Sequence, residues 1–380
     1  MAHRHILGMS GSGKSTLMKG WVVEAIHQGH AVCYIDPHGT DTDDLLQYIP
    51  PKRRKDVIVF DPTQFPISWN PLETDNPALT ASSFVDTIRI TSGYSNTPTP
   101  RIDALIYNGV YALCEARHGL FGLYLMLVSD RYRARVLEAV SNPVVLSFWQ
   151  WYADLSDKKR EEFTESTFTK IEMLVADPRI MAVLGSENRL HFPTVVANQI
   201  LFLRLPQGEL GVGKSALVGS LMLAQLHQHL LARDQAVPFE LFIDEAHNFA
   251  PSSLVEMLSG IRKSGVTLTL CHQYLSQLDP LLRSSLKANA DAYVFRTSYE
   301  DARFFPELGD NAMQPYELPP YSYWHFCSET KPTKFNSEPW DLAPYPASAR
   351  QVVAHVKRNL VSPATKENAK LMKNYLDGSA

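Results

Sequence analysis

A glycine-rich loop near the start of the chain constrains the fold more than any other stretch. Residues 8–16 read Gly-Met-Ser-Gly-Ser-Gly-Lys-Ser-Thr and follow the short apolar stretch His5–Leu7. They match the pattern G-x-x-x-x-G-K-[ST], in which glycines let the backbone wrap closely, so that successive N–H groups point at phosphate oxygens. A helical pattern follows, and the positive N-terminus of that helix would face the same anion. The sequence therefore predicts a strand, a phosphate-binding loop (P-loop) and a helix, in that order.

The residue types in this loop predict how a nucleotide and its metal ion would be held. We expect Lys14 to reach the β- and γ-phosphates and Ser15 to place its hydroxyl on Mg²⁺. The predicted cofactors are therefore ATP and Mg²⁺. The predicted ATP-binding residues are Gly8, Gly11, Ser12, Gly13, Lys14, Ser15 and Thr16.

Two later strands end in residues that suit hydrolysis. Residues 239–245 form an apolar strand that ends in adjacent acids, and an exposed pair at an edge strand is the alternative. We expect Asp244 to hold Mg²⁺ together with Ser15, and Glu245 to polarise the attacking water as a general base. The next predicted strand, 266–271, ends at His272 and Gln273, where a polar side chain can sense the γ-phosphate or orient water.

A second stretch, Gly208–Ser215, also satisfies the P-loop pattern. It too lies between a predicted strand, 199–205, and a predicted helix, 216–233. Two true P-loops would imply two ATPase domains, but only one later strand ends in adjacent acids, and this loop begins about three residues after its strand rather than directly on it. We therefore expect a helix start that matches by coincidence, which leaves the role of Lys214 open.

The remaining pattern predicts an α/β fold with a mainly parallel sheet, because short apolar strands alternate with helices. Between the sheet-forming stretches, apolar residues from Arg101 to about Arg189 recur at helical spacing. The aromatic run Phe148–Tyr152 fits a helical core better than a base-stacking platform, and Thr91–Pro100 reads as a loop. The expected domains are a core of residues 1–72 and 191–345, an inserted helical domain of residues 73–190, and a helical tail of residues 346–380.

Composition narrows the classes of protein. The chain has 380 residues, 45% of them hydrophobic and 20% charged, with a net charge of −4. These values are ordinary for a globular protein, and any DNA contact must therefore be local. The basic run Lys52–Lys55 reads as a solvated loop, with contact to phosphates as the alternative. The four cysteines form no C-x-x-C pair, which favours reduced thiols and no structural zinc. Reduced thiols favour a cytoplasmic protein. The longest apolar run, Leu120–Val128, is too short to span a bilayer, so we expect any membrane role to go through a partner.

Six motifs in one order carry a family resemblance: the P-loop, 35–39, 69–72, 243–246, 261–266 and 272–278. The chain resembles the HerA/FtsK superfamily of ATPases over nearly residues 3–330, and within it the soluble domain of TraG-like coupling proteins of type IV secretion and related DNA-packaging ATPases. The resemblance implies a RecA-like core that assembles as a ring, commonly a hexamer, with DNA in the centre and ATP between subunits.

The resemblance also assigns roles to individual residues. Arg262 matches an arginine finger that acts on the neighbour's nucleotide, with a surface arginine at a helix end as the alternative. Gln273 matches the sensor glutamine, with a simple strand-end hydrogen bond as the alternative. Asp36 and His38 match the second-strand motif, where an ordering role near the nucleotide is expected.

Relatives usually carry transmembrane helices or a small β-barrel before the P-loop strand, and this sequence shows neither before Gly8. We expect an ATP-driven DNA translocase that acts in DNA transfer or genome packaging and docks on a membrane or capsid portal partner. The sequence does not choose between single- and double-stranded DNA. The alternatives are a motor of the same fold that energises protein secretion, and an ATP-switched assembly module without translocation.

Overall fold

The structure is a computed structural model that describes residues 2–91, 99–185, 187–233, 237–249, 251–308, 312–327, 329–337 and 340–376. The chain divides into two compact units. The first unit comprises Met1–Phe60, Phe192–Gly208 and Gln225–Asn359, and the second comprises Asp61–His191, Glu209–Ala224 and Leu360–Ala380. The loop predicted at 91–100 falls largely outside the described residues.

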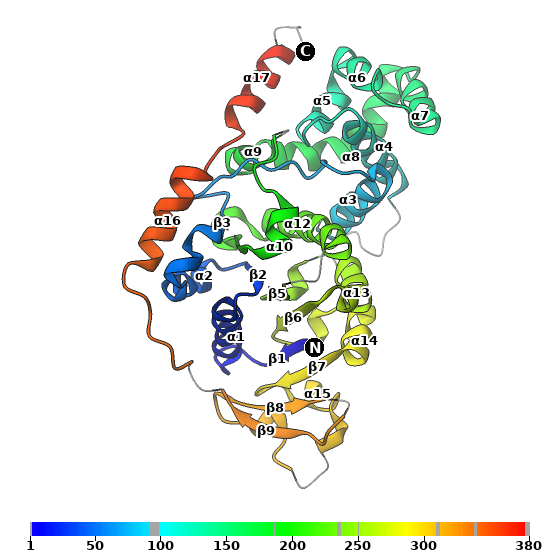
Figure 1. The fold of residues 1–380 in the computed structure, drawn as a ribbon. Coiled ribbons are helices and arrows are strands. Elements are labelled where there is room, and N and C mark those ends of the chain that lie inside the picture. Colours follow the sequence, from blue (N-terminus) through cyan, green and yellow to red (C-terminus); the bar gives the residue numbers. More distant parts are fainter. Residues whose placement is uncertain are drawn as a thin grey trace. The chain divides into compact units, whose positions relative to one another are not determined.

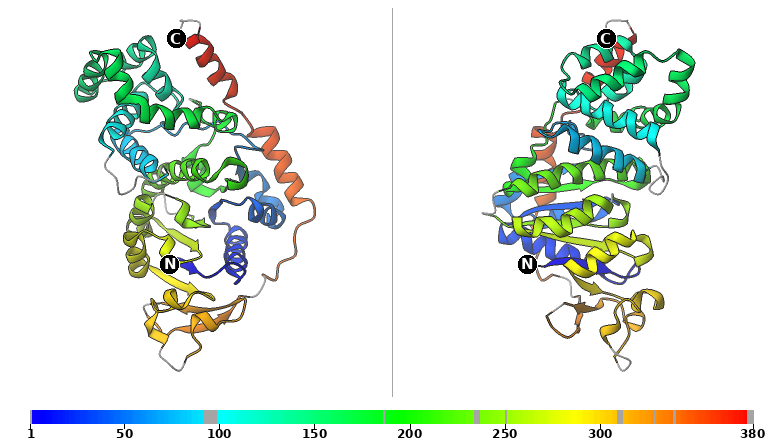
Figure 2. Two further views of the ribbon diagram at one scale, coloured as in Figure 1. Left: turned by 180° about the vertical axis from the view of Figure 1, so that it is seen from behind. Right: turned by 90° about the vertical axis from the view of Figure 1, so that its right-hand side faces the viewer.

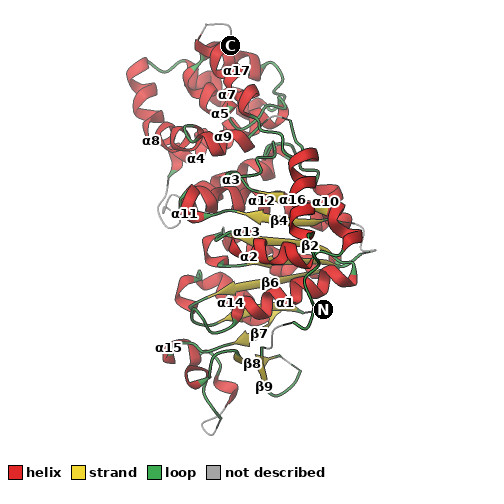
Figure 3. Ribbon diagram, turned by 90° about the vertical axis from the view of Figure 1, so that its left-hand side faces the viewer, coloured by secondary structure: helices red, strands yellow, loops and turns green. Residues whose placement is uncertain are grey.

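A mixed, mostly parallel sheet organises the first unit (Figure 3). Its nine described strands lie in the order β3-β4-β2-β5-β6-β1-β7-β8-β9, and the first seven run parallel while β8 and β9 are antiparallel. The predicted α/β class with a mainly parallel sheet is confirmed. The strands are β1 His3–Leu7, β2 Ala31–Asp36, β3 Val57–Phe60, β4 Ile200–Arg204, β5 Phe239–Ile243, β6 Val266–His272, β7 Ala290–Val294, β8 Ser322–Phe326 and β9 Thr333–Asn336.

Helices cover both faces of this sheet. The central strands β2, β4, β5 and β6 are buried along their whole length, because a parallel sheet with helices on both faces leaves no side for water. Figure 1 shows α1 and α16 on one face and α13 and α14 on the other. The helices of the first unit include α1 Lys14–Gln28, α2 Thr40–Leu45, α10 Phe192–Asn198, α13 Pro251–Gly260, α14 Pro280–Asn289, α15 Tyr299–Ala302 and α16 Ser348–Asn359.

The antiparallel hairpin β8–β9 extends the sheet beyond β7 (Figure 2). The sequence predicts a strand at 321–327, which contains β8, but gives no sign of β9. Every residue of β9 is exposed, so no apolar alternation marks it as a strand.

The second unit is helical in its described residues. Trp149 and Tyr152 are buried with the Arg133 guanidinium over both rings, at 5.9 and 4.9 Å from the centroids, whereas Trp151 is 46% exposed. The core interpretation of this aromatic run therefore holds for two of its rings. The unit contains α3 Pro77–Thr91, α4 Pro100–Glu115, α5 Gly122–Val128, α6 Asp130–Leu137, α7 Pro143–Ala153, α8 Asp157–Val175, α9 Pro178–Val183 and α17 Thr365–Leu376.

The boundaries between the two units differ from the predicted domain boundaries. Residues 61–72 group with the helical unit, because the buried Trp69 donates its backbone N–H to Val183 O at 2.7 Å and its own carbonyl accepts from Gly185. The expected tail is not one element: α16 belongs to the first unit and α17 to the second. No helix among the described residues has the length and apolarity that a bilayer span requires.

The basic run at 52–55 is not a simple solvated loop. Arg53 is buried and donates to the carbonyls of His30 and Asn198, and Arg54 donates to Ser348 on α16. Two of the four basic side chains, Arg53 and Arg54, therefore connect elements of the first unit through hydrogen bonds.

Candidate nucleotide-binding site

The strand order brings the predicted site residues to one edge of the sheet. Strand β6 lies between β5 and β1, so the carboxyl ends of these three strands are neighbours. In their registers Leu7 stands opposite His272, and Ile243 stands opposite Leu270. The P-loop, Gln273 and the acidic pair after Ile243 consequently leave the sheet at the same level. Ligands of open α/β sheets bind at this edge.

The P-loop is fixed by its backbone on both sides. Gly8 N–H donates to His272 O at 3.4 Å, and Met9 N–H donates to Arg296 O at 2.8 Å, beyond β7. Gly13 has φ 110°, and a Cβ there would lie 2.9 Å from Cδ1 of Tyr321. Both the left-handed conformation and the lack of space require glycine. The loop thus holds a shape that a side chain at Gly13 would disturb.

Two groups inside the loop fit an anion. Lys14 opens α1, is largely buried, and donates from Nζ to Met9 O at 3.1 Å across the loop. The Ser12 hydroxyl is buried without a hydrogen-bond partner in the described residues. An ammonium group has three donors, and a buried hydroxyl needs a partner, so phosphate oxygens would satisfy both.

The acidic pair is buried beside the loop. Asp244 is 7% exposed, and burial, followed by the neighbouring Glu245 carboxylate, raises the pKa of Asp244 to about 6. Two adjacent buried acids are costly unless a cation compensates them. Asp244 and the Ser15 hydroxyl in the first turn of α1 are oxygen donors of the kind that Mg²⁺ takes alongside substrate phosphates. The donor set therefore fits the predicted metal.

Glu245 is held in an unusual conformation. Its φ is 46°, in the left-handed region, and its Oε1 accepts a hydrogen bond from Gln273 Nε2 at 2.6 Å. Among the described residues, its buried Oε2 has no hydrogen-bond partner; His247 Nδ1 lies 3.3 Å away but not in hydrogen-bonding geometry. Non-glycine residues in such conformations cost of order 1–3 kcal/mol and cluster at functional sites. One oxygen of Glu245 is positioned by Gln273, and the other has capacity for a further donor such as water.

The Cys271 thiol, near the end of β6, lies close to Lys14 and to both acids. Burial and then the Asp244 carboxylate raise the pKa of this thiol well above its usual value, and Lys14 and Glu245 also act on it electrostatically. Lys14, Asp244 and Glu245 therefore all lie near the buried Cys271 thiol at the carboxyl edge.

Comparison with known proteins identifies the fold. A scan of family models finds no match to this sequence, and a search of curated proteins finds no significant relative. Solved structures do match. The unbound bacterial conjugative coupling protein TrwB has a TM-score of 0.61 at 16% identity, over 91% of this chain and 87% of that chain. TrwB in complex with ADP and Mg²⁺ has a TM-score of 0.60 at 17% identity, over 91% and 87%. VirB4 of Thermoanaerobacter pseudethanolicus has a TM-score of 0.59 at 15% identity, over 92% and 91%.

The chain has a RecA-like P-loop ATPase fold, which it shares with TrwB and VirB4. The resemblance expected from the ordered motifs is thereby confirmed at the level of the fold. In this RecA-like core, the residues predicted from the P-loop and from the ends of β5 and β6 lie together, whereas Arg262 does not lie with them.

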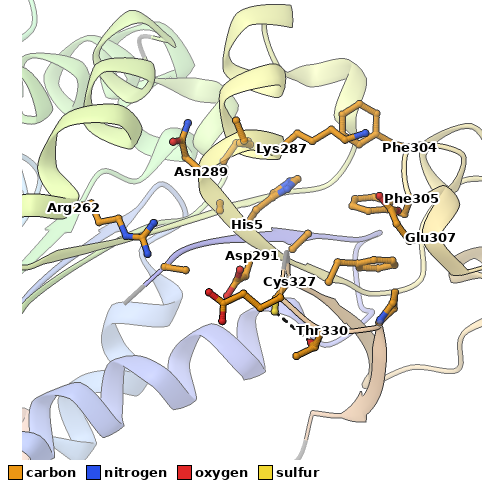
Figure 4. A pocket seen from close by; sticks show the side chains of 18 residues that line it. His5, Arg262, Lys287, Asn289, Asp291, Phe304, Phe305, Glu307, Cys327 and Thr330 are labelled. Atoms are coloured by element: carbon orange, nitrogen blue, oxygen red, sulfur yellow. Dashed lines mark hydrogen bonds between the residues drawn. The ribbon is translucent and has the colours of Figure 1, made fainter.

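Arg262 sits at the opposite edge of the sheet. It precedes the amino end of β6, whereas Gln273 follows the carboxyl end, and a seven-residue strand spans about 20 Å. Arg262 is exposed and lines a cavity of about 690 Å³ together with Lys287, Asn289 and Asp291 (Figure 4). Arg262 therefore cannot reach the phosphate site of its own RecA-like core.

The second-strand motif orders a helix. Asp36 accepts hydrogen bonds from the backbone N–H groups of His38, Gly39 and Thr42 at 2.7–3.0 Å, and from the Thr42 hydroxyl. It thereby fixes the turn into α2, whereas the His38 side chain is exposed. This arrangement fits the ordering role that the resemblance implied for Asp36.

The second P-loop match is built differently. Gly208 lies in the short helix α11, Gln207–Leu210, and Gly213 lies at the start of α12, Val212–Ala232, while Gly211 stands between the two helices with φ 86°. Lys214 donates to Asp177 Oδ2 at 2.6 Å, within the helical unit. The ammonium group is therefore occupied by a carboxylate that caps α9.

Sequence reasoning missed Tyr321. Its backbone N–H donates to Ser12 O at 2.7 Å, its φ is 62°, and its ring lies against Gly13 while remaining half exposed. No local sequence signal marks a tyrosine that adopts a left-handed conformation. Tyr321 and Ser12 are also far apart in the sequence, and only the fold brings them together. Tyr321 joins the hairpin β8–β9 to the phosphate loop.

Proposed function

We propose that this protein hydrolyses ATP with Mg²⁺ at the carboxyl edge of its sheet and uses the energy to translocate DNA. The observation that carries the proposal is the convergence of Lys14, Asp244 and Glu245 with a Gln273 side chain bonded to Glu245. Phosphoryl transfer depends mainly on positioning and on electrostatic stabilisation of the transferring group, and this set supplies both.

Each side chain has a distinct task in the proposed reaction. Lys14 places positive charge against the phosphate oxygens as negative charge shifts toward the leaving group. Glu245 accepts the proton of the attacking water through its free oxygen, while Gln273 holds the other oxygen in place. Mg²⁺ held by Ser15 and Asp244 would neutralise phosphate charge.

The position of Arg262 supports an oligomeric ring. A guanidinium group that stabilises the transferring phosphoryl must touch it, and the geometry of one chain forbids that. A second copy could present its Arg262 to this site, with ATP between subunits. We propose a homo-oligomeric ring, as a hexamer, that works in the cytoplasm and can dock on a membrane or portal partner.

The proposed cargo is DNA. TrwB, with TM-scores up to 0.61, is described as a bacterial conjugative coupling protein, and the resemblance of the ordered motifs points to the same group. The net charge of −4 restricts any DNA contact to a local surface. The match to VirB4 is nearly as good, and fold alone does not choose the cargo. Protein translocation is thus the second candidate.

ATP turnover measured with and without DNA tests the proposal. We expect single- or double-stranded DNA to raise turnover severalfold, with a stimulation that falls as salt rises. Glu245→Gln should lower turnover by about 100-fold or more while ATP binding persists, because only the general base is lost. Turnover without any response to either DNA would favour the protein motor. Binding of ATP with negligible turnover and a change of oligomeric state would favour the switch module.

A further inference from the structure

A groove leads away from the P-loop along helix α1. It has a volume of about 480 Å³, within the range of roughly 300–1,000 Å³ that is usual for small-molecule sites. Its floor is the face of α1 that carries Thr16, Leu17, Gly20 and Trp21, and its wall is the segment Trp340–Leu342 between β9 and α16. This segment passes beside α1 in Figures 1 and 2. We call this space the Trp340 groove.

The groove starts where a nucleotide would leave the P-loop. Thr16 belongs both to the first turn of α1 and to the lining of the groove. The reactive γ-phosphate must lie near Glu245 and Gln273, so the α-phosphate lies on the other side of the cradle, at the helix. Because Thr16 also lines the Trp340 groove, a nucleoside joined to that phosphate could extend into the groove.

Two fixed indole rings line the groove. Trp340 packs edge-to-face with Tyr48, at 5.2 Å between ring centroids, and is partly buried. Trp21 is held by Tyr293, at 4.8 Å, and by the Arg4 guanidinium 4.7 Å from its centroid. Rings whose orientation is already fixed lose little entropy when they stack on a planar ligand. Planar aromatic surface is what a nucleobase uses for stacking.

A glycine keeps the groove open at its centre. A Cβ at Gly20 would already stand in van der Waals contact with Cε3 of Trp340, at 3.6 Å. A longer side chain at this position of α1 would therefore occupy the space next to the indole. The lining also includes Glu24 and Asp341, whose carboxylates could accept hydrogen bonds from an exocyclic amino group.

We propose that the Trp340 groove binds the purine nucleoside of the nucleotide, with the base stacked on Trp340. The proposal rests on the proposed function, since the phosphates must lie in the P-loop. It makes Trp340 a binding residue that distinguishes a nucleotide from a bare polyphosphate.

Parallel titrations of the full-length protein with ATP and with inorganic tripolyphosphate test this. Trp340→Ala should weaken ATP binding by about 5- to 100-fold, the range that loss of one base–aromatic stack gives. It should leave tripolyphosphate binding unchanged, because that ligand reaches only the P-loop. Trp151→Ala, which removes an exposed indole from the helical unit, is the matched control and should alter neither.

A second variant guards against a folding defect. Gly20→Leu fills the groove and raises helix propensity, so α1 should persist while ATP, and not tripolyphosphate, binds more weakly. Unchanged ATP affinity in both variants, or equal weakening of both ligands, would overturn the groove assignment alone. Failure of the wild-type protein to bind either ligand would overturn the proposed function as well.

Discussion

Two loops of this chain match the same phosphate-binding pattern, but the helix that follows begins at a different point of the pattern in each. In the first, Gly13 adopts φ 110° and the loop wraps before α1 begins at Lys14. In the second, Gly211 is also left-handed, with φ 86°, but Gly213 already lies inside α12, and a Cβ added there would meet no atom of the described residues within 4 Å. A pattern of residue types is therefore compatible with a cradle and with an ordinary helix start.

The two loops also differ in the hydrogen-bond partner of their lysine. Lys14 donates to a carbonyl of its own loop and shares a buried environment with Asp244 and Glu245. Lys214 is paired with the Asp177 carboxylate, which also binds Arg179. An ammonium group that already has an anionic partner is a poor phosphate ligand. A functional P-loop therefore differs from a chance match in its backbone conformation and in the catalytic residues beside it.

The largest expected effect comes from exchanging the two lysines separately. Lys14→Ala should lower ATP turnover by about 100-fold or more, because it removes the positive charge that stabilises the transferring phosphoryl. Lys214→Ala should leave turnover within about twofold, since the Lys214 ammonium group is already paired with the buried Asp177 carboxylate. Steady-state phosphate release from both variants checks this. Retained turnover without Lys14, or its loss without Lys214, would reverse the assignment.

The sequence predicted the elements of the site well because their signals are local. A stretch of about ten residues is enough to predict each of these elements: strand β5 with its acids, the P-loop, and the start of α1. Each combines an apolar pattern with an adjacent motif. The position of Arg262 before β6 also follows from sequence, and the opposite edge it occupies follows from the direction of the strand.

The remaining features depend on contacts between distant parts of the chain. Whether β6 separates β5 from β1 is decided by packing of the whole sheet and not by any one strand. The boundary at Trp69 depends on its backbone pairing near Val183, more than 100 residues away. Tyr321 and Trp340 approach the P-loop and α1 only because the hairpin β8–β9 and the segment after it return across the unit. Sequence periodicity carries no record of such pairings.

A matched pair of glycine substitutions, one in each loop, should have effects of intermediate size. Gly13→Ala puts a Cβ into a left-handed residue and against Tyr321, which costs about 1–2 kcal/mol in backbone strain alone. ATP affinity should fall by roughly tenfold or more as the loop shifts. Gly213→Ala should leave affinity unchanged and raise the free energy of unfolding by up to about 1 kcal/mol, because alanine suits a helix better. Nucleotide titration and urea unfolding of both variants measure this. Equal losses of affinity would mean that both loops contact the nucleotide.

The smallest expected effect is the contribution of the Lys214–Asp177 ion pair to the free energy of unfolding. The Arg179 guanidinium, and after it the Lys214 ammonium, hold the pKa of Asp177 well below its usual value. A carboxyl group with a depressed folded-state pKa contributes stability that is present above its usual pKa of about 4 and is lost as the pH falls below it. Lys214→Met should therefore lower the free energy of unfolding by about 1 kcal/mol at pH 7.

The pH dependence of this term separates an ion pair from packing. The difference between Lys214→Met and the wild type should stay constant from pH 7 to about pH 4 and shrink only at lower pH, because the folded protein takes up the Asp177 proton well below the usual pKa of a carboxyl group. Asp177→Ala should cost about 2 kcal/mol or more at pH 7, because α9 also loses its N-cap hydrogen bond to Arg179 N–H. In the double variant, the Lys214→Met effect should vanish. A cost of Lys214→Met that persists without Asp177 would mean that Lys214 acts through another group, and the second loop would then need a new explanation.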